Sequence, residues 1–197
     1  MTNFDTGVGG CSIHGPITIC GHTDATCSDK MKVDRADEKP SAIEIATNTI
    51  VANLETGGFY PEFQGPEAEK RKQRLIEIAE QLPTLAPAVL TKFRELLEQE
   101  KIDGGKLSFF IVGGRVNATP IKDNTDFDIV LASEKRALAG GKIWRKRTGI
   151  WETLYQEIER LLGQLYEEGL IEIKGLGQRS AEDVEGEEGT LKIAELE

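Results

Sequence analysis

The sequence predicts an α/β (α+β) domain in which helices flank a small mixed sheet. Two observations predict this class: short, nearly all-apolar runs bounded by glycines, which are typical of buried strands, and longer segments whose apolar residues recur at helical spacing. A chain of 197 residues has room for one full domain but not for two large ones. We expect a loop-rich N-terminal segment over 1–40, the main domain over 41–178 and an acidic C-terminal tail over 179–197.

Three helices are expected before the first strand. Helical spacing over 41–54 predicts a helix that the Ser41 side chain caps, although its β-branched residues would also suit a strand. We expect a break after it at Gly57 and Gly58. A charged helix follows, and we expect Pro83 and Pro87 to end it because proline lacks the amide that a helix interior needs. The next helix begins near Pro87 and stops at Gly104. The expected core-facing residues of these last two helices are Leu75, Ala79, Leu82, Val89, Leu90, Phe93, Leu96 and Leu97.

Three strands and one further helix complete the predicted domain. The apolar runs 107–112 and 127–131 predict strands that are buried on both faces. Strict alternation over 170–174 predicts a third strand. The clearest helix of the chain lies between the second and third strands and ends at Gly169. Its broad apolar face consists of Trp151, Leu154, Tyr155, Ile158, Leu161, Leu162, Leu165 and Tyr166.

Charge and composition exclude several classes of protein. The formal net charge is −10, from 24 Lys and Arg against 34 Asp and Glu, so we expect no binding of bulk DNA or of anionic membranes. No apolar run approaches the roughly 18 residues that a membrane span needs. The first residues lack the basic and apolar regions of a secretory signal, and the three cysteines make an odd count. We therefore expect a cytoplasmic protein without structural disulfides.

Charged side chains gather in two segments. The last 18 residues hold seven acids and one lysine, which is typical of a mobile tail, although Leu191, Ile193 and Leu196 would suit a short edge strand. Residues 135–147 hold no acid and surround Trp144 with basic side chains. This window is either a solvated loop or a surface for a nucleoside triphosphate or a tRNA-like acceptor, with Trp144 as a stacking surface. Its basic residues are Lys135, Arg136, Lys142, Arg145, Lys146 and Arg147.

The most informative acids open the second predicted strand. Asp126 and Asp128 are two residues apart, so their side chains lie on the same face of that strand. A polar turn before the strand is one interpretation. Asp128, however, lies within an apolar run, where an acid without a partner is costly to bury. The pair therefore predicts a site for two Mg²⁺ (or Mn²⁺) ions, which clamp the attacking and leaving oxygens in phosphoryl transfer.

A double glycine, Gly113 and Gly114, ends the first predicted strand. Glycines allow a phosphate to approach the backbone, and their amides can donate to it. An ordinary turn at the end of a strand is the alternative. Arg115 follows directly and would either contact phosphate or form a surface salt bridge. Together with the aspartates, the glycines predict a triphosphate ligand.

These motifs resemble the nucleotidyltransferase superfamily of the DNA polymerase beta type, especially its minimal members. In that family a strand ends in Gly-Gly or Gly-Ser, and after a loop Asp-x-Asp opens the next strand. The matching residues are Gly113, Gly114, Arg115, Thr119, Thr125, Asp126 and Asp128, and the resemblance covers about residues 87–175. Two departures are the missing hydroxyl at Gly114 and an alanine, Ala118, where glycine is frequent.

The resemblance implies a nucleotidyltransferase-like fold and an enzyme that transfers a nucleoside monophosphate from an NTP to a hydroxyl. It implies that Asp126 and Asp128 bind the metal ions. It also implies that Gly113, Gly114, Arg115 and Thr125 bind the nucleotide. The acceptor is left open and would be a protein, an RNA end or a small molecule.

The resemblance also implies a third carboxylate on a later strand, and Glu172 is the best match because alternation isolates it on one face. A solvent-facing residue of an edge strand is the alternative. Asp128 together with Glu172-x-Lys174 also resembles restriction-type, metal-dependent nucleases, in which Lys174 would steady the attacking water. A third hypothesis is a non-catalytic, antitoxin-like module that binds nucleotide and meets a partner through the helix over 151–166.

All the cysteines and histidines of the chain fall in one N-terminal window. Thiolate and imidazole suit Zn²⁺, and four of the five would complete a tetrahedral site. The spacings match no standard zinc finger, so incidental cysteines in an unfolded leader are the alternative. The five residues are Cys11, His14, Cys20, His22 and Cys27.

Overall fold

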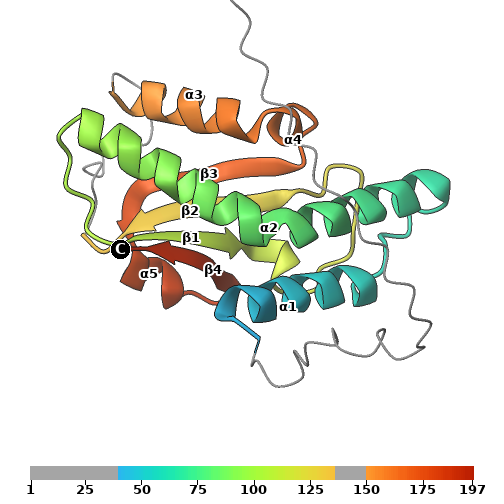
Figure 1. Ribbon diagram of the computed structural model, residues 1–197. Helices are drawn as coiled ribbons and strands as arrows, with labels where there is room; N and C mark the ends of the chain where they lie inside the picture. The colour runs from blue at the N-terminus through green and yellow to red at the C-terminus, as the bar shows by residue number, and fades with distance from the viewer. Residues whose placement is uncertain (1–39, 136–149) are drawn as a thin grey trace, which may run out of the picture. The chain divides into compact units, whose positions relative to one another are not determined.

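Four strands form one mixed sheet (Figure 1): β1 (Leu107–Val112), β2 (Phe127–Ser133), β3 (Ile171–Ser180) and β4 (Thr190–Leu196). Their order in the sheet is β3-β2-β1-β4. β1 runs antiparallel to β2 and β4, whereas β2 and β3 are parallel. The mixed sheet with its helices confirms the predicted α/β (α+β) class.

The computed structural model describes residues 40–135 and 150–197. Within these two ranges no helix is long and apolar enough to cross a membrane. The predicted N-terminal segment with its zinc site lies outside the described residues, and so do Trp144 and the basic window apart from Lys135. The predictions that fall outside concern Cys11, His14, Cys20, His22, Cys27, Arg136, Lys142, Arg145, Lys146 and Arg147.

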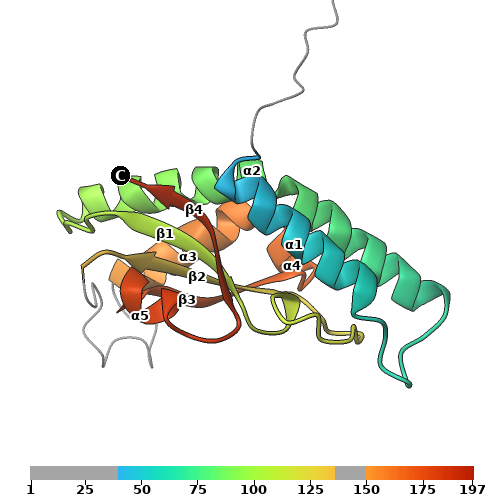
Figure 2. The same ribbon diagram turned by 90° about the horizontal axis from the view of Figure 1, so that it is seen from below.

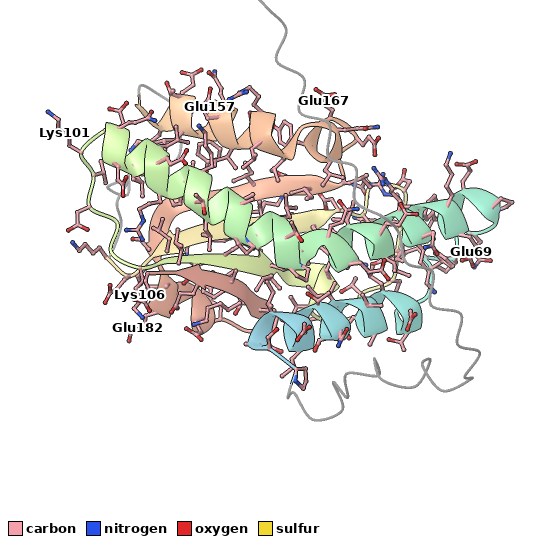
Figure 3. All side chains as sticks on the ribbon, viewed as in Figure 1. Glu69, Lys101, Lys106, Glu157, Glu167 and Glu182 are labelled. Atoms are coloured by element: carbon pink, nitrogen blue, oxygen red, sulfur yellow. The ribbon has the colours of Figure 1, made fainter. Side chains whose placement is uncertain are left out.

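Three helices cover one face of the sheet (Figure 1): α1 (Ala42–Thr56), α2 (Pro66–Gln99) and α3 (Ile150–Leu162). Their buried side chains form one core with strand residues such as Phe109, Phe127 and Ile129. Charged side chains lie on the outer sides, and Figure 3 shows Lys101 and Glu167 extending away from the ribbon. This division follows from burial of apolar surface, which is the main favourable contribution to folding.

The second face of the sheet carries one short helix, α5 (Ala181–Glu185), which lies on the side opposite α2 (Figure 2). Val184 of this helix packs with Phe110 and Val130. Because side chains alternate along a strand, Asp128 points to the same face as Val130. The acids predicted to bind metal therefore lie on the face that the three large helices leave uncovered.

α1 begins as the sequence predicts. The Ser41 hydroxyl accepts from the Glu44 amide at 3.3 Å, and the Glu44 carboxylate accepts from the Ser41 amide at 2.7 Å. This reciprocal pair satisfies two amides that the first turn leaves free. The helix ends at Thr56 with Gly57 as its C-cap, which confirms the predicted break.

α2 differs from the prediction, because Pro83 and Pro87 lie inside one continuous helix rather than at the boundary of two. An interior proline costs about 3 kcal/mol or more. The helix buries a long apolar face that passes both prolines, and each fully buried large side chain stabilises by about 1.5–3 kcal/mol. Its buried residues are Ala68, Leu75, Ile78, Ala79, Leu82, Ala86, Val89, Leu90, Phe93, Leu96 and Leu97. Tertiary burial therefore outweighs the local penalty.

The helix predicted to end at Gly169 is interrupted. α3 stops at Leu162, Gly163 adopts a φ of 50°, and the one-turn helix α4 (Gln164–Glu167) follows. A positive φ is the left-handed conformation that glycine adopts without the penalty of a side chain. Gly163 thus breaks a pattern that looked continuous.

The prediction of a mobile acidic tail over 179–197 is wrong. β3 extends to Ser180, α5 follows, and β4 pairs antiparallel with β1. Ile193 is buried, while Lys192 lies 3.3 Å from both Glu185 and Glu195. Acidic composition alone suggested disorder, but the alternation that the sequence showed here produces an edge strand.

Candidate metal centre

Asp126, Asp128 and Glu172 converge at one end of the second face. One carboxylate oxygen from each lies within 4.8 Å of the others. The sheet brings them together because Asp128 is paired with Glu172 across the parallel strands β2 and β3. The structure thus joins the two aspartates that alternation placed on one face with the glutamate chosen from the third strand.

A cavity of about 360 Å³ opens beside these carboxylates. Lys174 and the three acids line one part of it, and Tyr60 and the loop between β1 and β2 line the rest. The loop contributes Gly114, Arg115, Thr119, Pro120, Lys122, Asn124 and Thr125. Gly113 does not line the cavity, although the sequence predicts it as a nucleotide-binding residue.

Thr125 shapes the entry to β2. Its hydroxyl accepts from the Lys122 amide at 2.8 Å, and its own amide donates to the Lys122 carbonyl at 3.1 Å. The side chain is only 5% exposed. The polar turn considered as the alternative to a metal site is therefore present, and it places Asp126 in the acid cluster. The sequence predicts that Thr125 binds nucleotide, and in the structure its hydroxyl accepts a hydrogen bond within this turn.

Burial and a neighbouring carboxylate raise the pKa of each aspartate. The pKa of Asp128 is raised by burial and then by the charge of Asp126. The pKa of Asp126 is raised by burial and then by the charge of Glu172. Lys174 opposes both shifts. A cation among the carboxylates would remove this repulsion.

Lys174 lies against the cluster from the same face of β3. Its ammonium donates to Glu172 Oε2 at 2.7 Å and lies 3.4 Å from Asp128 Oδ1. The contact with Asp128 is an ion pair without hydrogen-bond geometry, so Oδ1 is buried with no hydrogen-bond partner. The hydrogen bond to Glu172 is the largest cause that raises the pKa of Lys174. One ammonium thus faces three carboxylates.

Gly113 adopts a φ of 78° and lies directly behind Asp128. A Cβ at this position would lie 3.3 Å from Asp128 Oδ2. The Gly113 amide donates to the Gly189 carbonyl at 2.8 Å, so the prediction that this amide faces a phosphate is wrong. The glycine instead lets the chain turn close to the carboxylate, and its amide fixes the loop before β4.

Arg115 is buried beside the cluster, with 5% of its surface exposed. Its guanidinium donates to the Thr119 carbonyl at 2.9 Å. Burial lowers the pKa of Arg115, and the charges of Asp126 and Asp128 oppose this shift. The surface salt bridge considered from the sequence is therefore wrong. Arg115 holds the loop in place and adds a positive charge to the cavity wall.

Ala118 has a φ of 51°, a conformation that favours glycine. This is the position where the nucleotidyltransferase pattern that the sequence resembles frequently has glycine. Asn53 of α1 stabilises the same loop by donating to the Val116 carbonyl at 2.6 Å. The loop beside the acids is thus held by contacts from α1 as well as by Arg115.

Comparison with protein-family models, with characterised proteins and with solved structures finds no match to this chain. The family resemblance therefore rests on the motif residues themselves. Among these, the structure brings Gly114, Arg115 and the aspartates around one cavity. Arg71, which sequence reasoning did not single out, contacts the chain on both sides of this site through backbone carbonyls. Nothing local in the sequence signals those contacts.

Proposed function

We propose that this protein is a metal-dependent nucleotidyltransferase that transfers a nucleoside monophosphate from an NTP to a hydroxyl acceptor. The observation that carries the proposal is the convergence of Asp126, Asp128 and Glu172 within 4.8 Å, beside a glycine turn on the uncovered face of the sheet. Keeping these partly buried acids charged costs free energy unless a cation neutralises them. Their retention in a cavity supports a functional role.

The donor set fits Mg²⁺ or Mn²⁺. Three carboxylates supply only oxygen ligands, which hard divalent cations prefer. Asp128 Oδ1 is buried and lacks a hydrogen-bond partner, and the pKa values of both aspartates are raised first by burial and then by a neighbouring carboxylate. Asp126, Asp128 and Glu172 would therefore hold the metal. When bound, divalent ions supply charge neutralisation for the triphosphate and the leaving pyrophosphate.

The chain's own residues would position the reactants around that centre. Gly114, which has no side chain, and the Arg115 guanidinium line the cavity on the side where a triphosphate would lie. Arg115 would offset charge on the departing pyrophosphate. Glu172, whose side chain is 52% exposed, would accept the proton of the attacking hydroxyl at the open edge. The new bond joins that oxygen to the α-phosphorus as the bond to pyrophosphate breaks.

A second candidate function is metal-dependent hydrolysis of nucleic acid. The observation that favours it is the contact of Lys174 with Glu172 at 2.7 Å and with Asp128 at 3.4 Å, which brings the nuclease-like residues together. In that case Lys174 would steady the attacking water. The nuclease hypothesis gives no role to Gly113, Gly114 and Arg115, so we place it second.

Labelled NTPs test the proposal directly. The protein is incubated with each NTP, Mg²⁺ or Mn²⁺ and a cell extract, and transfer of label and release of pyrophosphate are measured. We expect transfer that Asp128→Asn abolishes. Absence of both NTP binding and transfer under every metal condition would refute the proposal.

Two further outcomes favour the alternatives. Plasmid nicking that Lys174→Ala abolishes but Gly114→Val does not would favour the nuclease. Metal-dependent NTP binding without any product would favour a non-catalytic, antitoxin-like binding module.

A further inference from the structure

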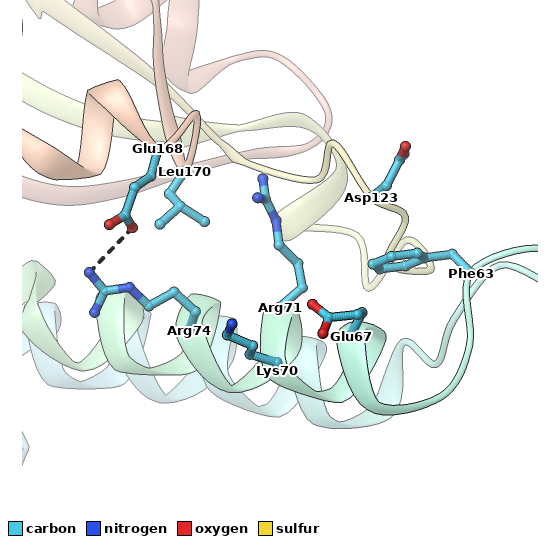
Figure 4. Close-up of a pocket in the computed structure, with 8 residues that line it drawn as sticks. All are labelled: Phe63, Glu67, Lys70, Arg71, Arg74, Asp123, Glu168 and Leu170. Atoms are coloured by element: carbon cyan, nitrogen blue, oxygen red, sulfur yellow. Dashed lines mark hydrogen bonds and ion pairs between the residues drawn. The ribbon is translucent and has the colours of Figure 1, made fainter.

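Arg71 reaches from α2 to the loops that precede two strands. Its Nε and Nη2 donate to the Thr125 carbonyl at 3.0 and 2.6 Å, and Nη2 also donates to the Gly169 carbonyl at 2.9 Å. Figure 4 shows the side chain rising from α2 between Leu170 and Asp123. One guanidinium therefore holds two chain segments that are far apart in sequence.

Both carbonyls lie next to the acid cluster along the chain. Thr125 directly precedes Asp126, and Gly169 lies three residues before Glu172. The same two segments meet where the Phe127 amide donates to the Leu170 carbonyl at 2.9 Å. Arg71 therefore binds where the loop that carries Asp126 and the strand that carries Glu172 begin to pair.

We propose that Arg71 is a positioning residue for the metal centre, because its guanidinium fixes the loop that carries Asp126 relative to the strand that carries Glu172. The planar guanidinium presents its donors in a fixed arrangement, so it can hold two acceptors at a defined separation. This inference rests on the proposed function in one respect, namely that the carboxylates bind a divalent metal. Groups that orient metal ligands commonly contribute to metal affinity in addition to the ligands themselves.

The basic neighbours of Arg71 on α2 do not share this arrangement. Arg74 forms one ion pair with Glu77 at 3.1 Å and another, which Figure 4 shows, with Glu168 at 3.5 Å. Lys70 is exposed on the wall of the adjoining cavity, which has a volume of about 380 Å³. Lys72 donates to the Glu55 carbonyl at 3.0 Å, far from the acids in sequence. None of these three side chains holds the backbone next to an acid of the cluster. The role therefore falls to Arg71.

Arg94 provides a matched control on the same helix. Its Nη2 donates to the Gly105 carbonyl at 2.7 Å and to the Glu197 carbonyl at 3.1 Å. Arg94 thus also ties backbone segments together, next to β1 and β4 but at the opposite end of β1 from Asp128. Substitution of either arginine removes a comparable set of hydrogen bonds, but only Arg71 adjoins the acids.

Mn²⁺ titration of the full chain, without nucleotide, tests the proposal. Wild type, Arg71→Gln and Arg94→Gln are compared by calorimetry well below their melting temperatures, which are measured in parallel. We expect Arg71→Gln to weaken Mn²⁺ binding by about 10–100-fold, as is typical for the loss of a group that orients metal ligands. Arg94→Gln should lower the melting temperature but leave the Mn²⁺ dissociation constant unchanged.

Arg71→Lys keeps the positive charge but cannot hold both carbonyls, so it should also weaken Mn²⁺ binding. It provides the comparison if Arg71→Gln does not fold. Wild-type Mn²⁺ affinity in the Arg71 variants would overturn this inference and leave the metal centre standing. Failure of the wild type itself to bind Mn²⁺ would overturn the metal centre and, with it, the role of Arg71.

Discussion

The two ends of the second face of the sheet differ in the side chains that they hold: apolar ones at one end and acidic ones at the other. At its packed end, Phe110, Val130 and Ala132 are buried with Val184 of α5. At its acidic end, the carboxylates of Asp126, Asp128 and Glu172 gather, and Lys174 forms ion pairs with the last two. The boundary between the ends lies within β2, where Asp128 and Val130 are two residues apart on one face.

This contrast shows how one strand serves stability and function at the same time. Burial of apolar side chains at the packed end stabilises the sheet. At the acidic end, burial and mutual repulsion raise the pKa values of Asp126 and Asp128, so the metal-free charges there oppose folding. An arrangement that opposes folding is expected where a ligand compensates for it.

The largest expected effect comes from the packed end. Phe110 is fully buried, and truncation of such a residue to alanine costs about 3–5 kcal/mol. Phe110→Ala should therefore strongly lower the free energy of unfolding in urea, while metal affinity stays that of the wild type. The milder Phe110→Leu variant keeps the test possible if the alanine variant does not fold. Loss of metal binding in a folded Phe110→Leu protein would show that the two ends are not separable.

The next effect concerns the turn behind Asp128. Gly113→Ala should cost about 1–2 kcal/mol for its left-handed backbone and should weaken metal binding, because the new Cβ would lie 3.3 Å from Asp128 Oδ2. Gly58→Ala is the matched control, since Gly58 has a φ of 66° with no atom near its Cβ position. It should lose stability without losing metal affinity. Equal metal affinity in the two variants would contradict the proposed contact.

The free energy of unfolding should depend on pH through the acidic end and not through the packed end. This effect is smaller than the previous ones, since solvent screens the half-exposed carboxylates. The folded pKa of Asp128 is raised above its ordinary 3.8. Such a group favours the folded state below the ordinary pKa, and this contribution is lost as pH rises through the raised value. In chelator, wild type should therefore lose stability relative to Asp128→Asn as pH rises above about 4, and the gap should then level off.

Urea unfolding over a pH series measures this gap. Val130→Ala serves as the control at the packed end, because it removes no titratable group and should show the wild-type pH profile. A stability gap between wild type and Asp128→Asn that does not change with pH would contradict the assigned repulsion.

The smallest effect is expected in the loop beside the acids. Ala118 has a φ of 51°, so Ala118→Gly removes backbone strain, although it adds freedom to the unfolded chain. We expect a net stabilisation of up to about 1 kcal/mol and unchanged metal affinity. Thermal unfolding measures it. A clear loss of stability would show that the alanine methyl group packs favourably.

Local patterns predicted those parts of the molecule that depend on local physics. The Ser41 cap and the strand containing Asp128 were both visible, because capping and period-two alternation act within a few residues. The convergence of Asp126 and Asp128 follows from the same alternation. Glu172 joined them because β2 and β3 pair in parallel register.

The missed features depend on contacts between distant segments. The continuity of α2 through Pro83 and Pro87 is explained only by the core that the helix covers. Arg71 lies 54 residues from Thr125 and 98 residues from Gly169. Hydrogen bonds between residues this far apart leave no local pattern in the sequence. Its role follows from the tertiary structure alone.

Thermal unfolding of wild type and Asp128→Asn, each with and without Mg²⁺ or Mn²⁺ in the presence of NTP, tests the central claim most directly. At a hundredfold excess over the dissociation constant, metal should raise the wild-type melting temperature by on the order of 5–10 °C. Asp128→Asn should lose this shift and, without metal, melt at or above the wild type because one repelling charge is gone. A wild-type melting temperature that does not respond to metal would contradict the assignment of Asp126, Asp128 and Glu172 as a metal centre.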